Sequence, residues 1–470
     1  MKSFKNTAFR GGSYSLIITA IVLAILIVVN ILVSALPATL TKIDISSSKL
    51  YSITGNTKVV VNSLTQDVTI YWIVQADEED DIIENLLAKY KSLSDHIEVV
   101  KKNPDVYPTF AQQYTDETVA NNSLVVESGE RYRYIAYSDI YVTEADMYSY
   151  SYTTSFDGEG AITSAIDYVV SEELPQIYCL TGHGESDLPS TLSDRITKDN
   201  LELQTLSLLT ADEIPEDCSC LMIYAPQSDI SDEEAEMLKT YAEDGGKLFV
   251  VAGPVEDSEL ENLYSILSDY GVTTNEGIVV ETDRDHYAFQ RPYILLPDMA
   301  ESDITDSLIE ENYYPIIPLA TGLTVKSGSG ATALLTTSDD SFSKIAGYQL
   351  TTYEKEEGDI DGPFALAVSV ETGNDGAIVW FASSDFLEDM YNAYSSGANT
   401  DLAMNAISSL IGQREAIAIR SKSLNYNYLT ISQSEGARLK TIMIGILPLA
   451  YLGIGIYIFV STRRKQNEAA

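Results

Sequence analysis

The segment Ile177–Ser186 reads IYCLTGHGES and defines the fold of the central part of the chain. Its apolar start is typical of a strand, the glycines of GHGE allow a sharp turn, and Asp187 can cap a following helix. The segment also brings a thiol (Cys179), an imidazole (His183) and a carboxylate (Glu185) within seven residues. In α/β folds, ligands bind at the carboxyl ends of sheet strands. The turn is therefore a candidate site, and the alternative is a purely structural turn.

The residues after this segment repeat the alternation of strand and helix. Ser231 and Glu234 form a capping box at the start of an expected helix. The apolar runs SCLMIYAP (219–226) and KLFVVAGP (247–254) suit buried parallel strands. This pattern predicts a flavodoxin-like α/β domain, with an open, mostly parallel sheet and helices on its faces. Residues 272–360 are less regular and indicate strands, loops and turns.

The residues before the segment predict a second, smaller α/β unit. Val68–Val74 is an apolar, β-branched run suited to a buried strand, and residues 82–90 carry apolar side chains at helical spacing. We expect Ser52 to cap a short helix, residues 128–130 to turn a hairpin, and a helix over 160–174 to close the unit. The order β-α-β-α-β-β-α is that of a thioredoxin-like domain. Because the unit has no C-x-x-C motif, it implies no redox chemistry.

The composition limits the classes of partner. The chain has 470 residues and a formal charge of −41, and hydrophobic residues make up 45% of it. This hydrophobic fraction indicates packed domains rather than a disordered chain. A surface this acidic repels the phosphates of nucleic acids, so we expect no nucleic-acid partner. The three cysteines are too few for a disulfide framework.

Two long apolar segments predict transmembrane helices at residues 15–36 and 441–460. The first has 22 residues without a charge. As a helix it would rise about 33 Å, which is enough to cross a bilayer. A cleaved signal peptide is the alternative, although the apolar run is longer than usual and no clear cleavage site follows it. The second segment contains Pro448, which a membrane helix tolerates when its neighbours satisfy the backbone.

The charges beside these segments predict the orientation of the chain. Residues 1–14 and 461–470 hold six of the 29 Lys and Arg residues but one of the 70 Asp and Glu residues. Residues 37–440 consequently carry 23 basic and 69 acidic residues. Basic flanks stay on the cytoplasmic side of a membrane. We therefore expect a cell-membrane protein with both termini in the cytoplasm and residues 37–440 outside it.

The predicted fold class is α/β, with two transmembrane helices that flank an extracytoplasmic body of two domains. The predicted segments are a cytoplasmic tail (1–14), a transmembrane helix (15–36), a thioredoxin-like membrane-proximal domain (37–172), an α/β domain (173–415) with an irregular insertion (about 272–360), a connector (416–440), a transmembrane helix (441–460) and a cytoplasmic basic tail (461–470).

The GHGE turn favours a structural role over a catalytic one. Catalysis would require a nucleophile within hydrogen-bond reach of the His183 imidazole. Cys179 lies four residues earlier, inside the expected strand, and the sequence has no G-x-S-x-G nucleophile elbow. We therefore expect Gly182, His183, Gly184 and Glu185 to form a structural turn, with contact to a ligand or partner as the alternative. No catalytic residue is predicted.

Other motifs give little support for a metal or nucleotide site. His286 has two aspartates beside it, but further metal ligands would have to come from distant residues. The segment EKEEGDIDG (354–362) loosely resembles a calcium loop but lacks the EF-hand spacing. The acidic run Asp77–Asp81 is typical of a solvated helix start. The sequence contains no G-x-x-x-x-G-K-[ST] motif, so the chain is not a P-loop ATPase. No metal and no cofactor are predicted.

The segment Gly160–Ser186, which contains GAITSAIDYVV and LPQIYCLTGHGES, resembles the signature of the GldG-like auxiliary proteins of ABC transporters, first named in gliding motility. The segments YSITGNTKVVVNSLTQDVTIYWI, GGKLFVVAGP and SSDFL…NTDLAMNAISSLIG are similar to the same pattern in order and spacing. The resemblance covers nearly the whole chain except residues 272–360. It implies a glutamine-amidotransferase-like α/β fold without the catalytic cysteine nucleophile, and it places the family motif on Gly182, His183, Gly184 and Glu185.

The resemblance also implies a function and partners. Such proteins work beside an ABC-2-type permease and a separate cytoplasmic ATPase, so we expect these two subunits and membrane lipid as partners. The expected function is that of a non-enzymatic, membrane-anchored auxiliary subunit whose extracytoplasmic body binds substrate or envelope partners. The alternatives are a stand-alone surface binding protein for a glycan or peptide, and a hydrolase that uses His183 and Glu185.

Overall fold

The computed structural model covers most of the chain between residues 52 and 412. The described residues are 20–29, 31, 50, 52–146, 151–171, 173–211, 213–256, 258–412, 422–424, 440, 448, 451, 453 and 455. By compactness the chain divides into two units, residues 1–423 and residues 424–470. The domain boundaries proposed from the sequence are not tested by this division and stay predictions.

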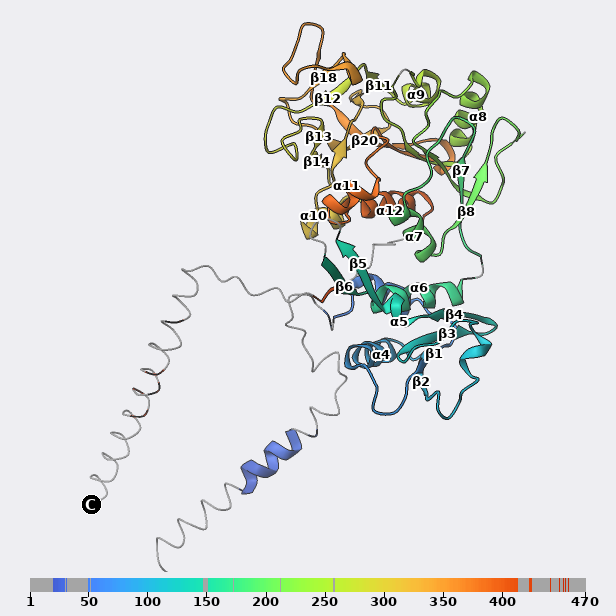
Figure 1. Ribbon diagram of the computed structural model, residues 1–470, viewed down its shortest axis with the longest axis vertical. Coiled ribbons are helices and arrows are strands. Elements are labelled where there is room, and N and C mark those ends of the chain that lie inside the picture. Colours follow the sequence, from blue (N-terminus) through green and yellow to red (C-terminus); the bar gives the residue numbers. More distant parts are fainter. Residues whose placement is uncertain are drawn as a thin grey trace, which may run out of the picture. The chain divides into compact units, whose positions relative to one another are not determined.

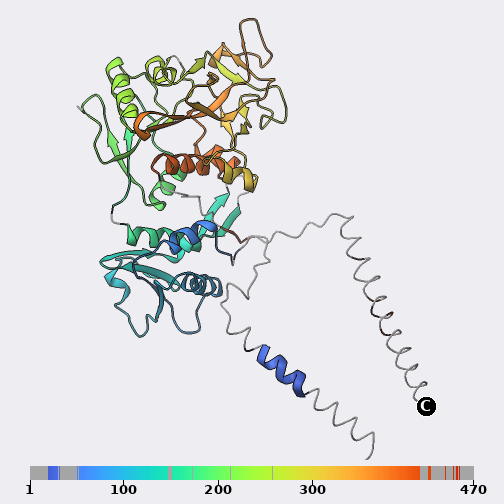
Figure 2. The ribbon, with the colours of Figure 1, turned by 180° about the vertical axis from the view of Figure 1, so that it is seen from behind.

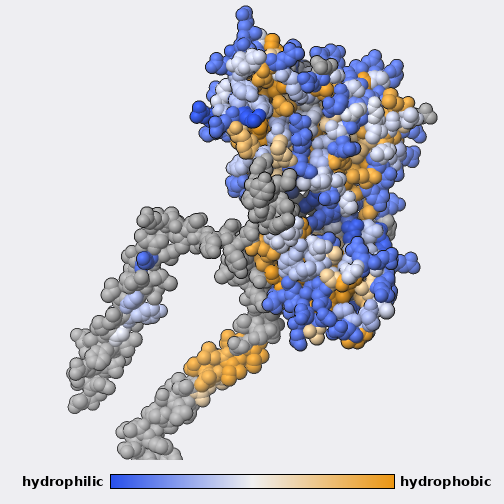
Figure 3. Space-filling model, viewed as in Figure 1, coloured by the Kyte–Doolittle hydropathy of each residue, from blue (hydrophilic) through white to orange (hydrophobic). Residues whose placement is uncertain are grey.

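The fold is α/β with mixed sheets, but the prediction that two transmembrane helices flank it is wrong. Within the described part of the chain, no helix is both long and apolar enough to cross a membrane. Residues 20–29 are helical, and their apolar side chains are exposed (Figure 3). Most of the two segments, 15–36 and 441–460, lies outside the described residues.

Four strands between residues 68 and 135 form one sheet in the order β2-β1-β3-β4. Strand β1 runs parallel to β2 and antiparallel to β3, and β3 forms a hairpin with β4. This arrangement differs from the predicted β-α-β-α-β-β-α order in two places: a short 3-10 turn (η2) replaces the helix between β2 and β3, and residues 137–156 add a short helix and two strands before the closing helix. The bounds are α3 Gly55–Asn62, β1 Val68–Ile73, α4 Asp81–Leu93, β2 Ile97–Lys102, η2 Ala111–Gln113, β3 Ser123–Ser128, β4 Arg131–Ile135 and α6 Gly158–Val170.

Side-chain caps explain where the first two helices begin. The carboxylate of Asp80 accepts hydrogen bonds from the backbone N–H groups of Ile82 and Ile83, at 2.9 and 3.0 Å. The acidic run before α4 is therefore a helix cap, as the sequence predicts. Helix α3 is capped by Thr54 rather than by the predicted Ser52, because Thr54 Oγ1 accepts from the N–H of Thr57.

One buried carboxylate connects two segments that are distant in the sequence. Glu159, in the first turn of α6, is 2% exposed. Its Oε1 accepts hydrogen bonds from the N–H and hydroxyl of Thr54, at 2.6 and 2.8 Å, and from the hydroxyl of Thr57 at 2.7 Å. Its Oε2 lies 2.7 Å from Nζ of Lys422. Residues 54–57 and residue 422 therefore meet at the same side chain.

A second small sheet contains Lys422, the basic partner of this carboxylate. Strand β6 pairs antiparallel with β5 on one side and with β22, which contains Lys422, on the other. The bounds are α5 Tyr137–Ile140, β5 Tyr141–Asp146, β6 Ser151–Phe156 and β22 Lys422–Ser423.

The larger sheet has a parallel centre and antiparallel flanks. Its parallel strands follow the order β8-β7-β9-β10-β21. In chain order this is 2-1-3-4-5, the strand order of flavodoxin-like folds. Antiparallel strands continue beyond β21, so the sheet is mixed rather than mostly parallel as predicted. The bounds are β7 Gln176–Leu180, β8 Glu202–Leu206, β9 Cys218–Tyr224, β10 Lys247–Val251, β11 Val272–Asn275, β14 Asp298–Met299, β16 Gly322–Val325, β17 Ala331–Thr336, β20 Ala365–Glu371 and β21 Ala377–Phe381.

Helices cover both faces of this sheet (Figures 1 and 2). Helices α7 and α12 pack on the face that carries Phe249, and helices α8 and α9 pack on the face that carries Val250. Neighbouring strand residues point to opposite faces, so the continuous apolar run of β10 fills both cores. The helix bounds are α7 Ser190–Lys198, α8 Asp232–Glu243, α9 Glu261–Ser268, α11 Asp389–Tyr394 and α12 Ala398–Leu410.

Residues 272–360 contribute strands to the main sheet as well as separate small elements. Strands β11, β16 and β17 belong to the main sheet, so its antiparallel side is built largely from this region. Short strands form two further sheets, β12-β18-β19 and β13-β15. The bounds are β12 Ile278–Val280, β13 Ile294–Leu295, α10 Asp306–Glu311, β15 Ile317–Pro318, β18 Phe342–Lys344, η3 Gly347–Gln349, β19 Ile360–Asp361 and η4 Gly373–Asp375.

Candidate functional site

The GHGE turn lies where the strand order of the main sheet reverses. Strand β7 has β8 on one side and β9 on the other, and open α/β sheets bind ligands beside such a reversal. Gly182 and Gly184 have φ angles of 130° and 74°, which explains why both positions are glycine. The N–H groups of Gln227 and Ser228, in the loop after β9, both donate to the carbonyl of His183 at 3.0 Å. The turn is thus bonded directly to the neighbouring loop.

The imidazole of His183 is held between two carboxylates. Its Nδ1 lies 3.2 Å from Oε1 of Glu185, and its Nε2 lies 3.1 Å from Oε2 of Glu234. His183 is 6% exposed, and both glutamate side chains are similarly buried. Because carboxylates accept hydrogen bonds, both contacts are satisfied together when both ring nitrogens carry hydrogen. The two carboxylates therefore hold the ring of His183 from both of its nitrogens.

Glu234 also closes the predicted capping box of α8. Its carboxylate accepts from the N–H of Ser231 at 2.9 Å, and its own N–H donates to the Ser231 hydroxyl at 3.2 Å. Burial raises the pKa of Glu234, but the hydrogen bonds from Ser231 and the contact with His183 outweigh it and hold the pKa below its usual range. The capping box ties the start of α8 to the GHGE turn.

Cys179 does not supply a nucleophile for this site. It lies within β7, and burial raises the pKa of its thiol to about 11. A thiol with that pKa is protonated near neutral pH, and the thiolate is the reactive form. The geometry favours the structural reading of the turn, in which Glu185 and Glu234 hold His183. The sequence signalled Glu234 as a capping residue, but gave no sign that it also contacts His183.

His286 lies in a loop with acidic neighbours. Its Nδ1 lies 3.1 Å from Oδ2 of Asp283, and its Nε2 lies 3.4 Å from Oδ2 of Asp298. Partial burial lowers its pKa, but the hydrogen bond with Asp283 and the charge of Asp298 outweigh this effect and raise the pKa overall. Within the described residues, no cluster of three or more His, Cys, Asp or Glu side chains is placed to hold a metal ion.

The segment that resembles a calcium loop holds a lysine instead. Nζ of Lys344 donates to the carbonyl of Glu354 at 2.7 Å, to Oε2 of Glu356 at 2.6 Å and to Oδ2 of Asp359 at 3.1 Å. The Lys344 side chain is fully buried, and so is that of Asp359. An internal ammonium group therefore occupies the position between these oxygens.

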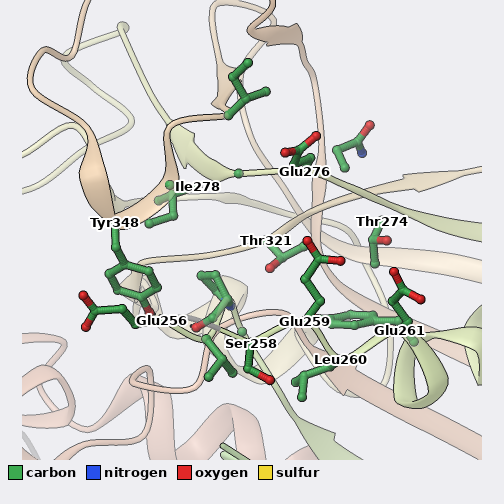
Figure 4. Close-up of a pocket in the computed structure, with 18 of the residues that line it drawn as sticks. Glu256, Ser258, Glu259, Leu260, Glu261, Thr274, Glu276, Ile278, Thr321 and Tyr348 are labelled. Carbon is green, nitrogen blue, oxygen red and sulfur yellow. Dashed lines mark hydrogen bonds between the residues drawn. The ribbon is translucent and has the colours of Figure 1, made fainter. Parts of the chain in front are cut away.

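A cleft of about 1030 Å³ lies at the carboxyl end of β10 (Figure 4). One wall is the loop Gly253–Leu260 with α9, the opposite wall is formed by residues 272–278, and a third is formed by Ile345–Gln349. Gly253 permits the close approach of this loop to the segment after β21, since its N–H donates to Oγ of Ser384 at 2.9 Å. The sequence analysis missed this cleft because its walls come from segments that are far apart along the chain.

Four glutamates give the cleft its electrostatic character. Figure 4 shows Glu259 extended into the cleft, with Glu256 on the side of Tyr348 and Glu261 on the side of Thr274. Glu276 lies on the opposite wall. No Lys, Arg or His is among the described residues that line the cleft. The arrangement offers negative charge and hydroxyl groups to a ligand.

A family comparison identifies the region that holds both the turn and the cleft. Residues 174–406 match the model of a family described as an ABC-type uncharacterized transport system. This region is similar to an auxiliary family of ABC-type transport systems. Residues 47–143, which contain the smaller sheet, match a domain of unknown function, DUF7088. The match supports an accessory role in an ABC transport system, which is the general part of the function that the sequence predicts.

Comparison with curated proteins and solved structures adds no further assignment. No curated protein matches the sequence. The N-terminal domain of mmIFT52 aligns with 52% of this chain and 100% of its own length, at 18% identity and a TM-score of 0.39. A glutamine amido transferase from Methylobacillus flagellatus aligns with 52% of this chain and 97% of its own length, at 11% identity and a TM-score of 0.29. Similarities this low bear on neither the fold nor the activity.

Proposed function

We propose that this chain is a non-enzymatic accessory subunit of an ABC transporter that works beside a permease and a separate ATPase. The match of residues 174–406 to the ABC-type transport family is the observation that carries the proposal. The chain has no P-loop motif of its own, so a partner must hydrolyse ATP. The GHGE turn supports a structural role rather than a catalytic one for its residues, because His183 is held by Glu185 and Glu234.

Two further parts of the proposal concern the relation of this chain to the GldG-like proteins and the cellular location of residues 37–440. The order and spacing of the segments around Gly160–Ser186 support a relation to the GldG-like proteins of gliding motility. The acidic excess of residues 37–440 over the basic chain ends supports a location of these residues outside the cytoplasm. Contacts with a permease and with lipid belong to the same proposal.

Co-purification tests the partnership. The full-length chain, tagged and extracted from its native cells under mild conditions, should bring down a P-loop ATPase and a multi-span permease that mass spectrometry identifies. An untagged strain is the control for non-specific capture. Recovery of the chain as a solitary, monodisperse protein would contradict the proposal. If that solitary protein bound a glycan or peptide, the alternative of a stand-alone surface binding protein would be favoured.

An activity screen tests the absence of catalysis. The full-length chain and its His183→Ala variant should show the same background rate on esters, amides and glycosides. A hydrolytic rate that the variant loses would overturn the non-enzymatic proposal and would favour the hydrolase.

A further inference from the structure

A pocket of about 350 Å³ lies at the carboxyl ends of β1 and β2. These two strands run parallel, and their last residues, Ile73 and Lys102, lie side by side and both line the pocket. The remaining walls come from the loop between β2 and η2, from η2 itself and from the loop between η2 and β3. Open α/β sheets bind ligands beyond the carboxyl ends of their strands, and the volume of this pocket is typical of small-molecule sites. Its position and its size therefore both suit a ligand.

The ammonium group of Lys102 is held at this pocket by three aromatic rings. Its Nζ lies 4.9 Å from the ring centre of Phe110, 5.2 Å from that of Tyr107 and 5.3 Å from that of Tyr71. Ring faces attract a positive charge but offer no carbonyl or carboxylate oxygen to its N–H groups. Lys102 makes no hydrogen bond and no ion pair with any residue that the structure describes. The rings thus fix the position of a charge and leave its hydrogen-bond donors to a ligand.

The lack of an oxygen partner distinguishes Lys102 from other lysines of similar or greater burial. The ammonium groups of five such lysines each lie against an oxygen atom of another residue: Lys198, Lys239, Lys247, Lys344 and Lys422. The chain has 70 acidic residues for 29 Lys and Arg, so acidic partners are abundant. Asp105, close to Lys102 in the sequence, instead accepts from the side-chain amide of Gln75 at 3.0 and 3.1 Å. The local structure therefore keeps the nearby acid away from this lysine.

A second set of donors without acceptors belongs to the same pocket. Residues 118–120 line it, and their backbone N–H groups donate to no residue within the described ranges. Gln75 holds the two loops of the pocket together, since it exchanges hydrogen bonds of 3.1 and 2.9 Å with Asn121 and also donates to Asp105. A pocket whose walls are fixed in advance loses less entropy when it binds a ligand. The pocket is thus preformed and rich in donors.

The rest of the lining determines the kind of acceptor that fits. Two prolines and two aromatic rings supply apolar surface, from Pro104, Tyr107, Pro108 and Phe110. Glu117, the acid among the described lining residues, is exposed and makes no ion pair with them. One ammonium group beside one acid matches the single charge of a carboxylate better than the double charge of a phosphate monoester. Aromatic and proline walls pack against a carbon chain or ring attached to that carboxylate.

We propose that this pocket binds a carboxylic acid, with the carboxylate against the ammonium group of Lys102 and an apolar group between Tyr107 and Phe110. A free apolar acid and the C-terminal residue of a peptide share this chemistry. The proposal does not rest on the transporter assignment, because the pocket lies outside residues 174–406, which match the transport family. It gives a binding role to residues 47–143, which match a domain of unknown function.

Isothermal titration calorimetry on the full-length protein tests the proposal. The probes are 3-phenylpropionate and the N-acetylated tripeptide Ala-Ala-Phe, each compared with its uncharged amide. The salt concentration is about 0.15 M, where a Debye length of about 8 Å screens the distant acidic charges of the chain. We expect one of the acids to bind at one site, and its amide to bind at least about tenfold more weakly, because the amide lacks the charge that pairs with Lys102.

A pair of variants locates the site. Lys102→Met keeps an apolar stem against the rings but removes the charge, and Lys91→Met removes an exposed charge from the last turn of α4, away from the lining. We expect the acid to bind at least about tenfold more weakly to Lys102→Met and less than about twofold more weakly to Lys91→Met. Thermal melting verifies that both variants are folded. If Lys102→Met fails to fold, Lys102→Gln takes its place, and the comparison of acid with amide on the wild type still decides the proposal.

The outcomes separate the sources of the ligand from failure of the proposal. Binding of 3-phenylpropionate alone assigns a small acid, and binding of the tripeptide alone assigns a peptide C-terminus; either supports the proposal. Absence of binding by both acids, equal affinity for acid and amide, or an equal effect of the two variants overturns it. Co-purification with a permease is measured separately, so each of the two proposals can fail without the other.

Discussion

The ammonium group of Lys344 lies at the centre of an acidic loop. Three oxygens from Glu354, Glu356 and Asp359 surround its ammonium group, in a segment whose sequence resembles a calcium loop. Burial lowers the pKa of Lys344, but the hydrogen bonds with Glu356 and Asp359 raise it overall, so the group stays charged. The sequence shows the acidic residues of the loop, but the lysine that neutralises them lies ten residues before Glu354.

Replacing Lys344 should therefore destabilise the protein. In Lys344→Met the buried Asp359 loses its counter-charge, and removing one partner of a buried pair is strongly unfavourable. We expect the Tm to fall by roughly 5 °C or more in a thermal melt. Lys355→Met, which breaks an exposed pair with Asp361, is the matched control and should change the Tm by about 1 °C or less. Equal Tm values for the two variants would refute this role of Lys344.

The lowered pKa of Glu234 predicts that the protein loses folding stability as the pH falls into the acid range. A carboxylate whose pKa is lower in the folded state stabilises the fold above its unfolded pKa of about 4.3, and this stability is lost as the pH falls through the folded pKa. In urea denaturation between about pH 5 and pH 3, Glu234→Gln should lose less stability than the wild type. Glu233→Gln, an exposed neighbour on α8, should follow the wild type. Parallel curves for all three proteins would contradict the prediction.

At the scale of elements, the approach of two segments at the end of β10 depends on Gly253. A Cβ at this position would lie 2.6 Å from the backbone N of Ser384 and 2.9 Å from Cα of Ser383. Backbone atoms must move to make room, so Gly253→Ala should cost about 1–3 kcal/mol of the free energy of unfolding in chemical denaturation. Gly330→Ala is the control, because its nearest neighbour would be the Glu371 carbonyl at 3.5 Å. A cost below about 0.5 kcal/mol for Gly253→Ala would show that the segments can separate freely.

Elements with a strong local signal were predicted from the sequence. The apolar run Val68–Val74 contains β1, the capping box at Ser231 starts α8, and the GHGE turn follows β7. In each case the side chains that decide the structure are neighbours in the sequence. The structure corrects local details: Thr54 rather than Ser52 caps α3, and a 3-10 turn replaces the helix expected between β2 and β3.

Features that depend on distant contacts were not predictable in this way. The antiparallel half of the main sheet draws β11, β16 and β17 from residues 272–360, whose short apolar runs carry no information about their partners. The second carboxylate on His183 comes from a helix 51 residues further along the chain. The cleft was missed for the same reason, since its walls come from residues near 253–268, 272–278 and 345–349, which are separate in the sequence.

At the scale of the whole molecule, Glu159 links residues 54–57 to Lys422. In Glu159→Gln the hydrogen bonds to both threonines weaken and the buried ammonium of Lys422 loses its counter-charge. We expect amide hydrogen exchange to become at least about tenfold faster in both segments, measured by mass spectrometry on peptic peptides. Glu130→Gln, at the exposed tip of the β3–β4 hairpin, is the control and should leave exchange in both segments unchanged. Faster exchange in one segment alone would show that the carboxylate does not couple them.

The shared carboxylate has a consequence for the connectivity of the polypeptide. Because residues 54–57 and Lys422 bond to one side chain, a short linker would suffice to close the intervening chain into a ring. New ends could then be opened at Gly328, where a side chain would meet open space. Residues 54–422 of this protein are thus suited to circular permutation, with the new junction beside α6.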